Sequence, residues 1–325
     1  MNMNSVIAEV TRGGILESQH RGAYAVSDSS GKIVAQDGDI FCPVFPRSAI
    51  KAFQCLPVIE SGAAEQFGFS DEEIALCCAS HGGEPEHVRV ARSILAKAGL
   101  TESAYECGVH WPNDRNAAYA LVRQNQDALA IHNNCSGKHA GMLALSKHLG
   151  AATADYVRPD HIVQRTIART IEHMCDVDLS HAAVGIDGCS VPTWAMPLAN
   201  MALGFARLCD ENNRAARRIL TSVRAHPFMV AGTGRFDTKV MQAIPRLFLK
   251  TGAEGVYCGC ISHAGLGFAL KCDDGATRGA EVATVSLMLK LDVWTTEERS
   301  LLTSFTHQTL TNWRKIEVGE VYANP

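Results

Sequence analysis

The chain has 325 residues, of which 46% are hydrophobic and 20% charged, and its formal net charge is -4. This balance is typical of a globular protein with enough apolar residues for a large core. The lysines and arginines are scattered rather than gathered into a nucleic-acid-binding stripe, and the apolar runs are too short to cross a bilayer.

The first ten residues include Glu9 and lack the basic start and apolar middle of a signal peptide. We therefore expect a cytoplasmic protein. Twelve cysteines lie mostly inside apolar segments without local pairing. In a reducing compartment we expect most of them to be small core residues and a few to be metal ligands.

The expected fold class is α/β (α+β), with a mainly antiparallel sheet packed with helices plus a helical lobe. Strands are predicted at residues 6–10, 23–27 and 32–35, which form an opening antiparallel meander, and later at 182–186, 256–261 and 267–271. Helices are predicted from Pro46 onward, at 88–98, up to residue 149, at 160–174 with Asp160 as the cap, and at 215–223, 280–291 and 297–313. No linker or repeat divides the chain, so we expect one catalytic unit over residues 1–325, of one or two lobes.

The segment Pro46-Arg47-Ser48-Ala49-Ile50-Lys51 is predicted to begin a helix, because Pro46 suits a first turn. Residues three apart on a helix are neighbours on one face, so Lys51 is expected to reach Ser48. A lysine activates a serine only when burial or a nearby positive charge lowers its pKa. Taken alone, a Ser-x-x-Lys pair is more often part of a solvated helix surface.

Two further serines follow apolar runs. Residues 74–79 end in Ser80-His81-Gly82-Gly83, where the glycines permit a tight backbone. Residues 128–131 lead into a segment containing Ser136-Gly137-Lys138-His139. A phosphate-binding loop is rejected there, because its first glycine and its Ser or Thr after the lysine are missing.

Ser48 with Lys51, together with the segment Lys250-Thr251-Gly252, resembles the serine β-lactamase and penicillin-binding protein arrangement, although a Ser-Asp-Asn triplet is missing. A closer resemblance is to the rhizobial-type, class 3 L-asparaginases. Their five motifs occur here in order, as Pro-Arg-Ser-x-x-Lys, Ser-His-Gly-Gly-Glu, Asn-Asn-Cys-Ser-Gly-Lys-His, Asp-Gly-Cys-x-x-Pro and Lys-x-Gly-Ala-Glu-Gly, at residues 46–51, 80–84, 133–139, 187–192 and 250–255.

The resemblance implies a fold related to serine β-lactamases and glutaminases, and hydrolysis of L-asparagine through two Ser-Lys tandems. The first tandem carries over as Ser48 and Lys51, and the second as Ser80 with Lys250. Lys271 competes with Lys250 for that role, and His263 lies between them in sequence. The resemblance also implies a zinc ion held by Cys135, Lys138 and Cys189, which spacing alone would not have chosen.

A selective site for asparagine needs both signs of charge. Arg47 could pair with the substrate carboxylate, Asp187 or Glu84 with its ammonium, and His139 is a further substrate-binding residue. We expect Ser48 to be acylated, with Ser80 relaying protons. The open alternatives are a glutaminase or broader amidase, a zinc-dependent hydrolase, and a non-catalytic amino-acid-binding protein. A homodimer is the default assembly.

Overall fold

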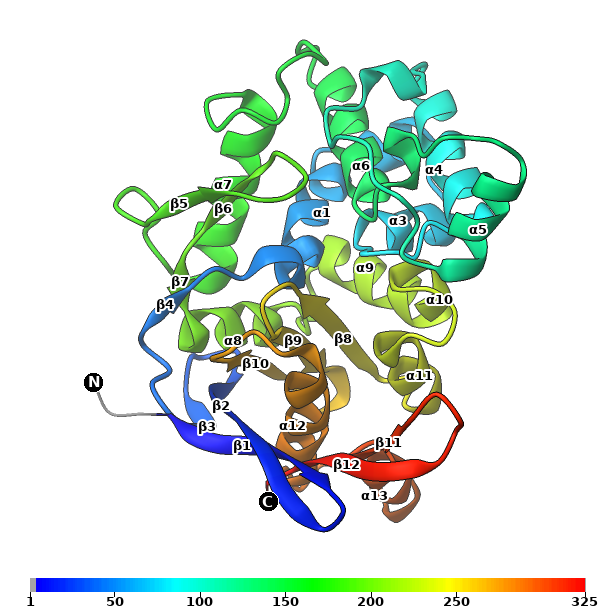
Figure 1. Cartoon of the computed structure of the whole chain (residues 1–325). Coiled ribbons are helices and arrows are strands. Elements are labelled where there is room, and N and C mark those ends of the chain that lie inside the picture. The colour runs from blue at the N-terminus through cyan, green and yellow to red at the C-terminus, as the bar shows by residue number, and fades with distance from the viewer. Residues whose placement is uncertain (1–3, 325) are drawn as a thin grey trace. The chain divides into compact units, whose positions relative to one another are not determined.

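The computed structural model describes residues 4–324 (Figure 1). Their contacts divide them into two compact units. The first comprises the residues up to Ala49, Met196–Cys209 and the residues from Val240 onward, and the second comprises Ile50–Ala195 and Asp210–Lys239. Within residues 4–324, no helix has both the length and the apolar character to span a membrane.

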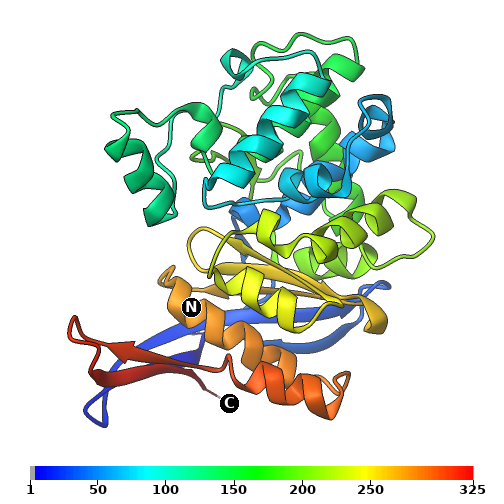
Figure 2. The same ribbon diagram turned by 90° about the vertical axis from the view of Figure 1, so that its right-hand side faces the viewer.

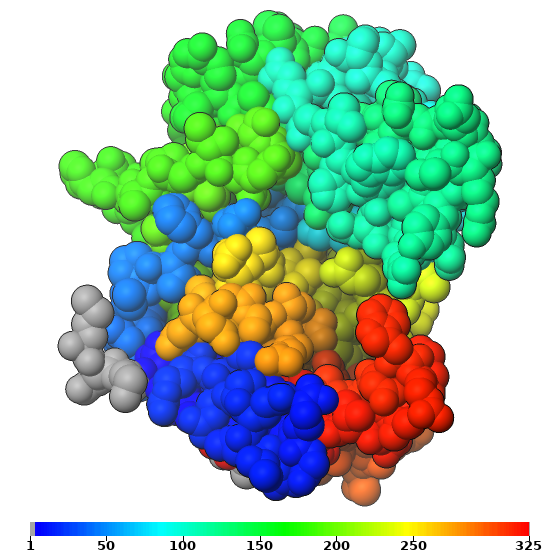
Figure 3. Space-filling view, in the orientation of Figure 1, coloured from blue at the N-terminus to red at the C-terminus, as the bar shows by residue number. Residues whose placement is uncertain are grey.

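The first unit is built on an antiparallel sheet of eight strands in the order β11-β12-β1-β2-β10-β9-β8, with β3 paired to β2. Its strands are β1 Ser5–Arg12, β2 Ile15–Asp28, β3 Ile33–Asp37, β8 Leu247–Gly252, β9 Val256–Ile261, β10 Leu266–Cys272, β11 His307–Thr311 and β12 Glu317–Ala323. Strands from the two ends of the chain pair directly, with Ala8 opposite Ala323. Figure 3 shows the β1–β2 hairpin (blue) and the last strands (red) side by side.

Three helices complete the first unit: α8 Leu198–Arg207, α12 Thr277–Leu289 and α13 Thr296–Thr303. α8 packs on β2 and β10, whereas α12 packs on β1, β9, β10 and β12 and lies along the sheet in Figure 2. Strands β9 and β8, the last two in the sheet order, are buried at every residue, as expected for strands covered on both sides. The short strands β4 Pro43–Val44 and β7 Met196–Pro197 pair separately.

The second unit is mainly helical. It contains α1 Lys51–Glu60, α2 Ala63–Gln66, α3 Asp71–Cys77, α4 Pro85–Lys97, α5 Arg115–Arg123, α6 Ser136–His148, α7 Ile162–Cys175, α9 Arg214–Ala225, α10 Pro227–Val230 and the hairpin of β5 Val184–Ile186 with β6 Pro192–Trp194. α11 Phe236–Ala243 begins in the second unit, which ends at Lys239, and continues into the first. The predicted fold class, an antiparallel sheet with helices plus a group of helices, is confirmed.

The glycine of the Ser-Gly-Lys segment allows two of these helices to meet. Gly137 lies in α6, and a Cβ atom built on it would be 2.4 Å from the carbonyl oxygen of Leu76 in α3. Real Cβ atoms do not come that close, so only glycine permits this packing. The segment is part of a helix–helix contact, which agrees with the rejection of a phosphate-binding loop.

Four details of the predicted elements were wrong. Residues 297–313 are not one helix, because α13 ends at Thr303 and residues 307–311 pair with β12 as strand β11. α7 is capped by His161, whose side chain accepts from Val163 N, and not by Asp160. Residues 247–252 form a strand that was not predicted. Ser48 lies in a 3₁₀ turn, Arg47–Ile50, and the α-helix starts only at Lys51.

Candidate active site

Lys51 is completely buried at the start of α1 and has three acceptors within reach. Its Nζ donates to the Ala79 carbonyl oxygen at 2.5 Å, to Ser80 Oγ at 2.9 Å and to Cys135 Sγ at 3.1 Å. These three acceptors surround a single side-chain nitrogen. Three of the five motifs are therefore joined at one lysine, and Lys51 contacts the second serine, to which the sequence had assigned Lys250.

The loop after α3 is rigidly held. Ser80 N donates to Val230 O at 2.9 Å, and His81 N donates to Asn134 O at 3.1 Å. His81 accepts from Gly83 N at Nδ1, so its Nε2–H donates to Ser136 Oγ, 3.0 Å away. Burial lowers the pKa of His81, which stays neutral. His81 is an ordinary hydrogen-bonding residue, and it fixes the Ser80 loop to α6.

The predicted metal ligands Cys135, Lys138 and Cys189 lie together and are buried. Lys138 Nζ is 3.0 Å from Cys189 Sγ. A hydrogen bond from the Cys135 thiol, helped by Lys138 and opposed by burial, lowers the pKa of Cys189 to about 5. The same hydrogen bond together with burial raises the pKa of Cys135 to about 12. The surroundings of Cys189 therefore favour its thiolate form.

Burial alone would lower the pKa of Lys138, but the sulfur atoms of Cys189 and Cys135 outweigh it and raise the pKa. The ammonium of Lys138 and the thiolate of Cys189 thus form an ion pair inside the second unit. An ion pair of this kind is costly to bury unless both charges are satisfied.

His139 is fully buried and presents an unsatisfied donor. The hydroxyl of Tyr156 accepts from Glu106 N at 3.0 Å, so its own proton goes to His139 Nδ1, 2.7 Å away. Burial lowers the pKa of His139, and the neutral ring therefore carries its proton on Nε2. In the described part of the chain this Nε2 is buried without a hydrogen-bond partner. A buried donor of this kind is free to bind an acceptor of a ligand.

The remaining predicted substrate-binding residues occupy special backbone positions. Arg47, directly before Ser48, has φ 52°, a left-handed conformation that costs a non-glycine residue about 1 kcal/mol. Asp187 lies at the turn of the β5–β6 hairpin, where its Oδ1 accepts from Gly188 N at 2.8 Å. Glu84 is bound to Thr233, which donates to both carboxylate oxygens at 2.8 and 2.6 Å. Glu84 therefore fixes the glycine-rich turn at 232–235.

Lys250 is completely buried in β8, within the first unit, where its Nζ donates to Thr251 O at 2.6 Å. Its pairing with Ser80 stays a prediction. Its competitor Lys271 likewise donates to the carbonyl oxygen of the next residue, Cys272, and His263 Nε2 donates to Val293 O at 2.8 Å. A fully buried lysine is rare, which favours Lys250 over Lys271 for a chemical role.

Sequence reasoning missed Tyr156 and Ser136, which orient His139 and His81. Tyr156 lies in an irregular segment between α6 and α7, and no motif marks it. Ser136 lies within the third motif, but the resemblance assigned no role to it. Such residues act by orienting another side chain, so only the tertiary structure identifies them.

Comparison with known proteins gives one match over nearly the whole length. The model of the family described as L-asparaginase II matches residues 8–323. A comparison with curated proteins found no match. Among solved structures, the chain is similar to Mglu, with 12% identity, TM-score 0.39 and coverage of 85% of this chain and 69% of that one. It is also similar to a β-lactamase from Mycobacterium bovis, with 13% identity, TM-score 0.41 and coverage of 88% and 95%.

Proposed function

Because the chain belongs to the L-asparaginase II family, we propose that it hydrolyses the side-chain amide of L-asparagine to L-aspartate and ammonia. The family inferred from the five motifs is confirmed, and with it an enzyme that hydrolyses amides. The observation that supports this chemistry best is the buried Lys51, whose Nζ lies 2.9 Å from Ser80 Oγ.

In the proposed mechanism, Ser48 Oγ attacks the amide carbon of the substrate while Lys51, three residues further along the chain and acting as a neutral amine, accepts the hydroxyl proton. Ser80, hydrogen-bonded to Lys51, passes that proton to the leaving nitrogen. The carbon–nitrogen bond breaks, ammonia leaves, and a β-aspartyl ester stays on Ser48. Water then attacks this ester, with its proton taken up along the same route and returned to Ser48, and aspartate leaves.

Substrate recognition is assigned to Arg47 for the α-carboxylate, to Asp187 for the α-ammonium, and to His139. The Nε2–H of His139 supports this role, because it is a buried donor without an acceptor in the described part of the chain. Lys250 is proposed to polarise Ser80. A glutaminase of the same type differs by one methylene, worth about 1 to 3 kcal/mol of discrimination, so both amides belong in the test.

A zinc ion is proposed at Cys135, Lys138 and Cys189. A tetrahedral site with Zn–S of about 2.3 Å and Zn–N of about 2.0 Å separates sulfur from nitrogen by about 3.5 Å. The 3.0 Å between Lys138 Nζ and Cys189 Sγ would fit after a small side-chain movement and loss of a proton from the Lys138 ammonium, because only the neutral amine binds a metal. When bound, zinc would polarise a substrate oxygen or a water molecule. Zinc content by elemental analysis should fall from about one per chain to near zero in Cys189→Ser, and unchanged content would contradict this assignment.

The function is tested by ammonia release from L-asparagine and L-glutamine, using the parent, Ser48→Ala, Ser80→Ala and the control Ser180→Ala, whose serine is exposed. We expect release from asparagine by the parent and the control, and at least a 1000-fold loss in Ser48→Ala. Mass analysis of acid-quenched enzyme should find the acyl group on Ser48. An adduct on Ser80 alone would reverse the two roles.

Other outcomes identify the alternatives. Full activity in both serine variants, abolished by chelation, would indicate a zinc-dependent hydrolase. Saturable asparagine binding without ammonia would indicate a binding protein. A homodimer stays a prediction, which analytical ultracentrifugation of the parent would test.

A further inference from the structure

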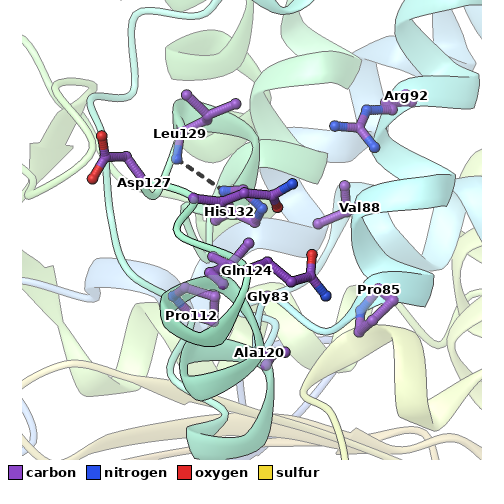
Figure 4. A pocket seen from close by; sticks show the side chains of 13 residues that line it. Gly83, Pro85, Val88, Arg92, Pro112, Ala120, Gln124, Asp127, Leu129 and His132 are labelled. Carbon is purple, nitrogen blue, oxygen red and sulfur yellow. Dashed lines mark hydrogen bonds between the residues drawn. The ribbon is translucent and has the colours of Figure 1, made fainter.

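A cavity lies within the helical unit and takes no part in the chemistry proposed above. Its volume is about 540 Å³, within the range of small-molecule sites. Figure 4 shows its lining, which comes from α4, α5 and the segments around them. It is lined by Gly83, Pro85, Val88, Arg92, Pro112, Ala117, Ala120, Leu121, Gln124, Gln126, Asp127, Leu129 and His132.

Most of this lining is apolar, and one wall is only loosely held. Val88 from α4, and Ala120 and Leu121 from α5, provide aliphatic surface. α5 contains no buried residue, so the helix covers the cavity without being packed into a core. An apolar molecule placed between α4 and α5 would bury these side chains, which is favourable by about 25 cal/mol per Å².

His132 supplies the polar group that points to a ligand. The residue is only 8% exposed, and its Nδ1 accepts from Leu129 N at 2.9 Å. Burial, with a contribution from the nearby charge of Arg92, lowers the pKa of His132, so the neutral ring carries its proton on Nε2. In residues 4–324 this Nε2 donates to no other group, although the ring lines the cavity.

Two donor groups at the cavity suit a carboxylate near His132. Arg92 lines the cavity, with its Nε ion-paired to Glu102 at 2.6 Å, and its guanidinium carries further N–H donors. In Figure 4 the guanidinium of Arg92 lies on the same side of the cavity as Val88, whereas the carboxylate of Asp127 points away from His132. A carboxylate is the group that a neutral imidazole N–H and a guanidinium both bind.

We propose that this cavity binds a small monocarboxylate with an apolar body, its carboxylate held by His132 Nε2–H and Arg92 and its body between α4 and α5. The cavity shares residues with the Ser80 loop. A Cβ atom on Gly83 would lie 3.0 Å from both His132 O and Pro112, and Asp114 N donates to Gly82 O at 2.9 Å. A carboxylate bound in the cavity therefore restrains Ser80-His81-Gly82-Gly83. Its effect on amide hydrolysis rests on the proposed function.

Calorimetry on the full chain with 3-phenylpropionate tests the binding itself, independently of activity. We expect saturable one-to-one binding that is at least tenfold weaker for the uncharged 3-phenylpropanamide. Ala120→Trp, which fills the cavity from a surface helix, should abolish binding, whereas Val122→Trp on the same helix should not, because Val122 is 61% exposed and does not line the cavity.

Arg92→Gln should weaken binding at least tenfold. The matched control Arg89→Gln, in the same helix and also ion-paired, should leave it unchanged. No binding to the parent, equal binding of acid and amide, or undiminished binding in Ala120→Trp would each overturn the proposal. Ammonia release is measured in parallel, so that binding in the cavity and amide hydrolysis are tested separately. If the protein hydrolyses no amide, the calorimetric result on binding still stands.

Discussion

At the scale of single residues, the most informative contact joins Lys51 to Ser80, 29 positions further along the chain. The sequence predicted that Lys51 serves Ser48, because helix geometry can be worked out from spacing. The contact with Ser80 depends on how α1 packs near α3, and no local pattern encodes that packing. Under the proposed mechanism, Lys51 would carry the proton for both serines, since it contacts Ser80 and follows Ser48 by three residues.

His139 leads to a prediction at the same scale. Tyr156→Phe removes the hydroxyl that donates to His139 Nδ1 and accepts from Glu106 N. We expect a fall in the free energy of unfolding of about 1 to 3 kcal/mol, because two buried groups lose their partner. We also expect about a tenfold loss of kcat/KM for asparagine, because the ring no longer has one fixed tautomer. Urea denaturation and steady-state kinetics measure the two effects.

Tyr105→Phe is the matched control. Tyr105 is also a buried tyrosine, but its hydroxyl has no hydrogen-bond partner in the described part of the chain. Its removal should leave stability equal or slightly higher and activity unchanged. Equal effects of the two substitutions would show that Tyr156 acts only as a core residue.

At the scale of helices and strands, the contact between α3 and α6 holds the Ser80 loop beside Cys135. Gly137→Ala would place a methyl group 2.4 Å from the Leu76 carbonyl oxygen, so the helices must separate. We expect a loss of about 2 to 4 kcal/mol of stability and most of the activity. Thermal denaturation and ammonia release test this. Gly188→Ala is the control for stability alone, because no atom lies within 4 Å of a Cβ there but Gly188 N donates to Asp187.

The start of α13 carries a pH-dependent contribution to stability. Glu298 accepts from Thr295 N as a helix cap and pairs with Arg246. The hydrogen bond from Arg246 lowers the pKa of Glu298 from 4.5 to about 2. Because the folded-state pKa is depressed, this stabilisation is present above pH 4.5 and is lost as the pH falls from 4.5 toward 2.

Glu298→Gln should therefore cost about 1 to 2 kcal/mol at pH 7 after allowance for solvent screening, and the difference from the parent should shrink below pH 4.5. Urea denaturation at pH 7, 4.5 and 3 measures it. Glu297→Gln, one residue earlier and exposed, should have no effect. If the loss of unfolding free energy in Glu298→Gln were the same at every pH, it would come from the altered helix cap and not from the charge of the carboxylate.

The errors in the predicted elements have a common physical origin. Residues 307–311 alternate between exposed and half-buried, so their own apolar pattern is weak, and they form a strand because β12 is there to pair with them. Helices with strong amphipathic patterns or caps, such as α4 and α9, were predicted correctly. Local patterns thus predicted these two helices, whereas strands at the sheet edge depend on partners distant in the sequence.

At the scale of the whole molecule, each of the two units is assembled from separate stretches of chain. In the first unit, Val321 from β12 packs with Ala8 and Val10 from β1 and with Val282 from α12. Val321→Ala should lower the free energy of unfolding by about 1 to 3 kcal/mol, because it leaves a cavity where both ends of the chain meet. Val318→Ala, half-buried in the same strand, should cost less. Equal losses in denaturant titrations would contradict this.

The pairing of β1 with β12 has a consequence for biosynthesis. β2 follows β1 immediately, but the strand that covers the other edge of β1 comes at the far end of the described chain. At about 5 to 20 residues per second, a ribosome needs on the order of half a minute to reach it. During that time β1 presents an open edge to other nascent chains. Chaperone occupancy on translating ribosomes should therefore persist until β12 has emerged.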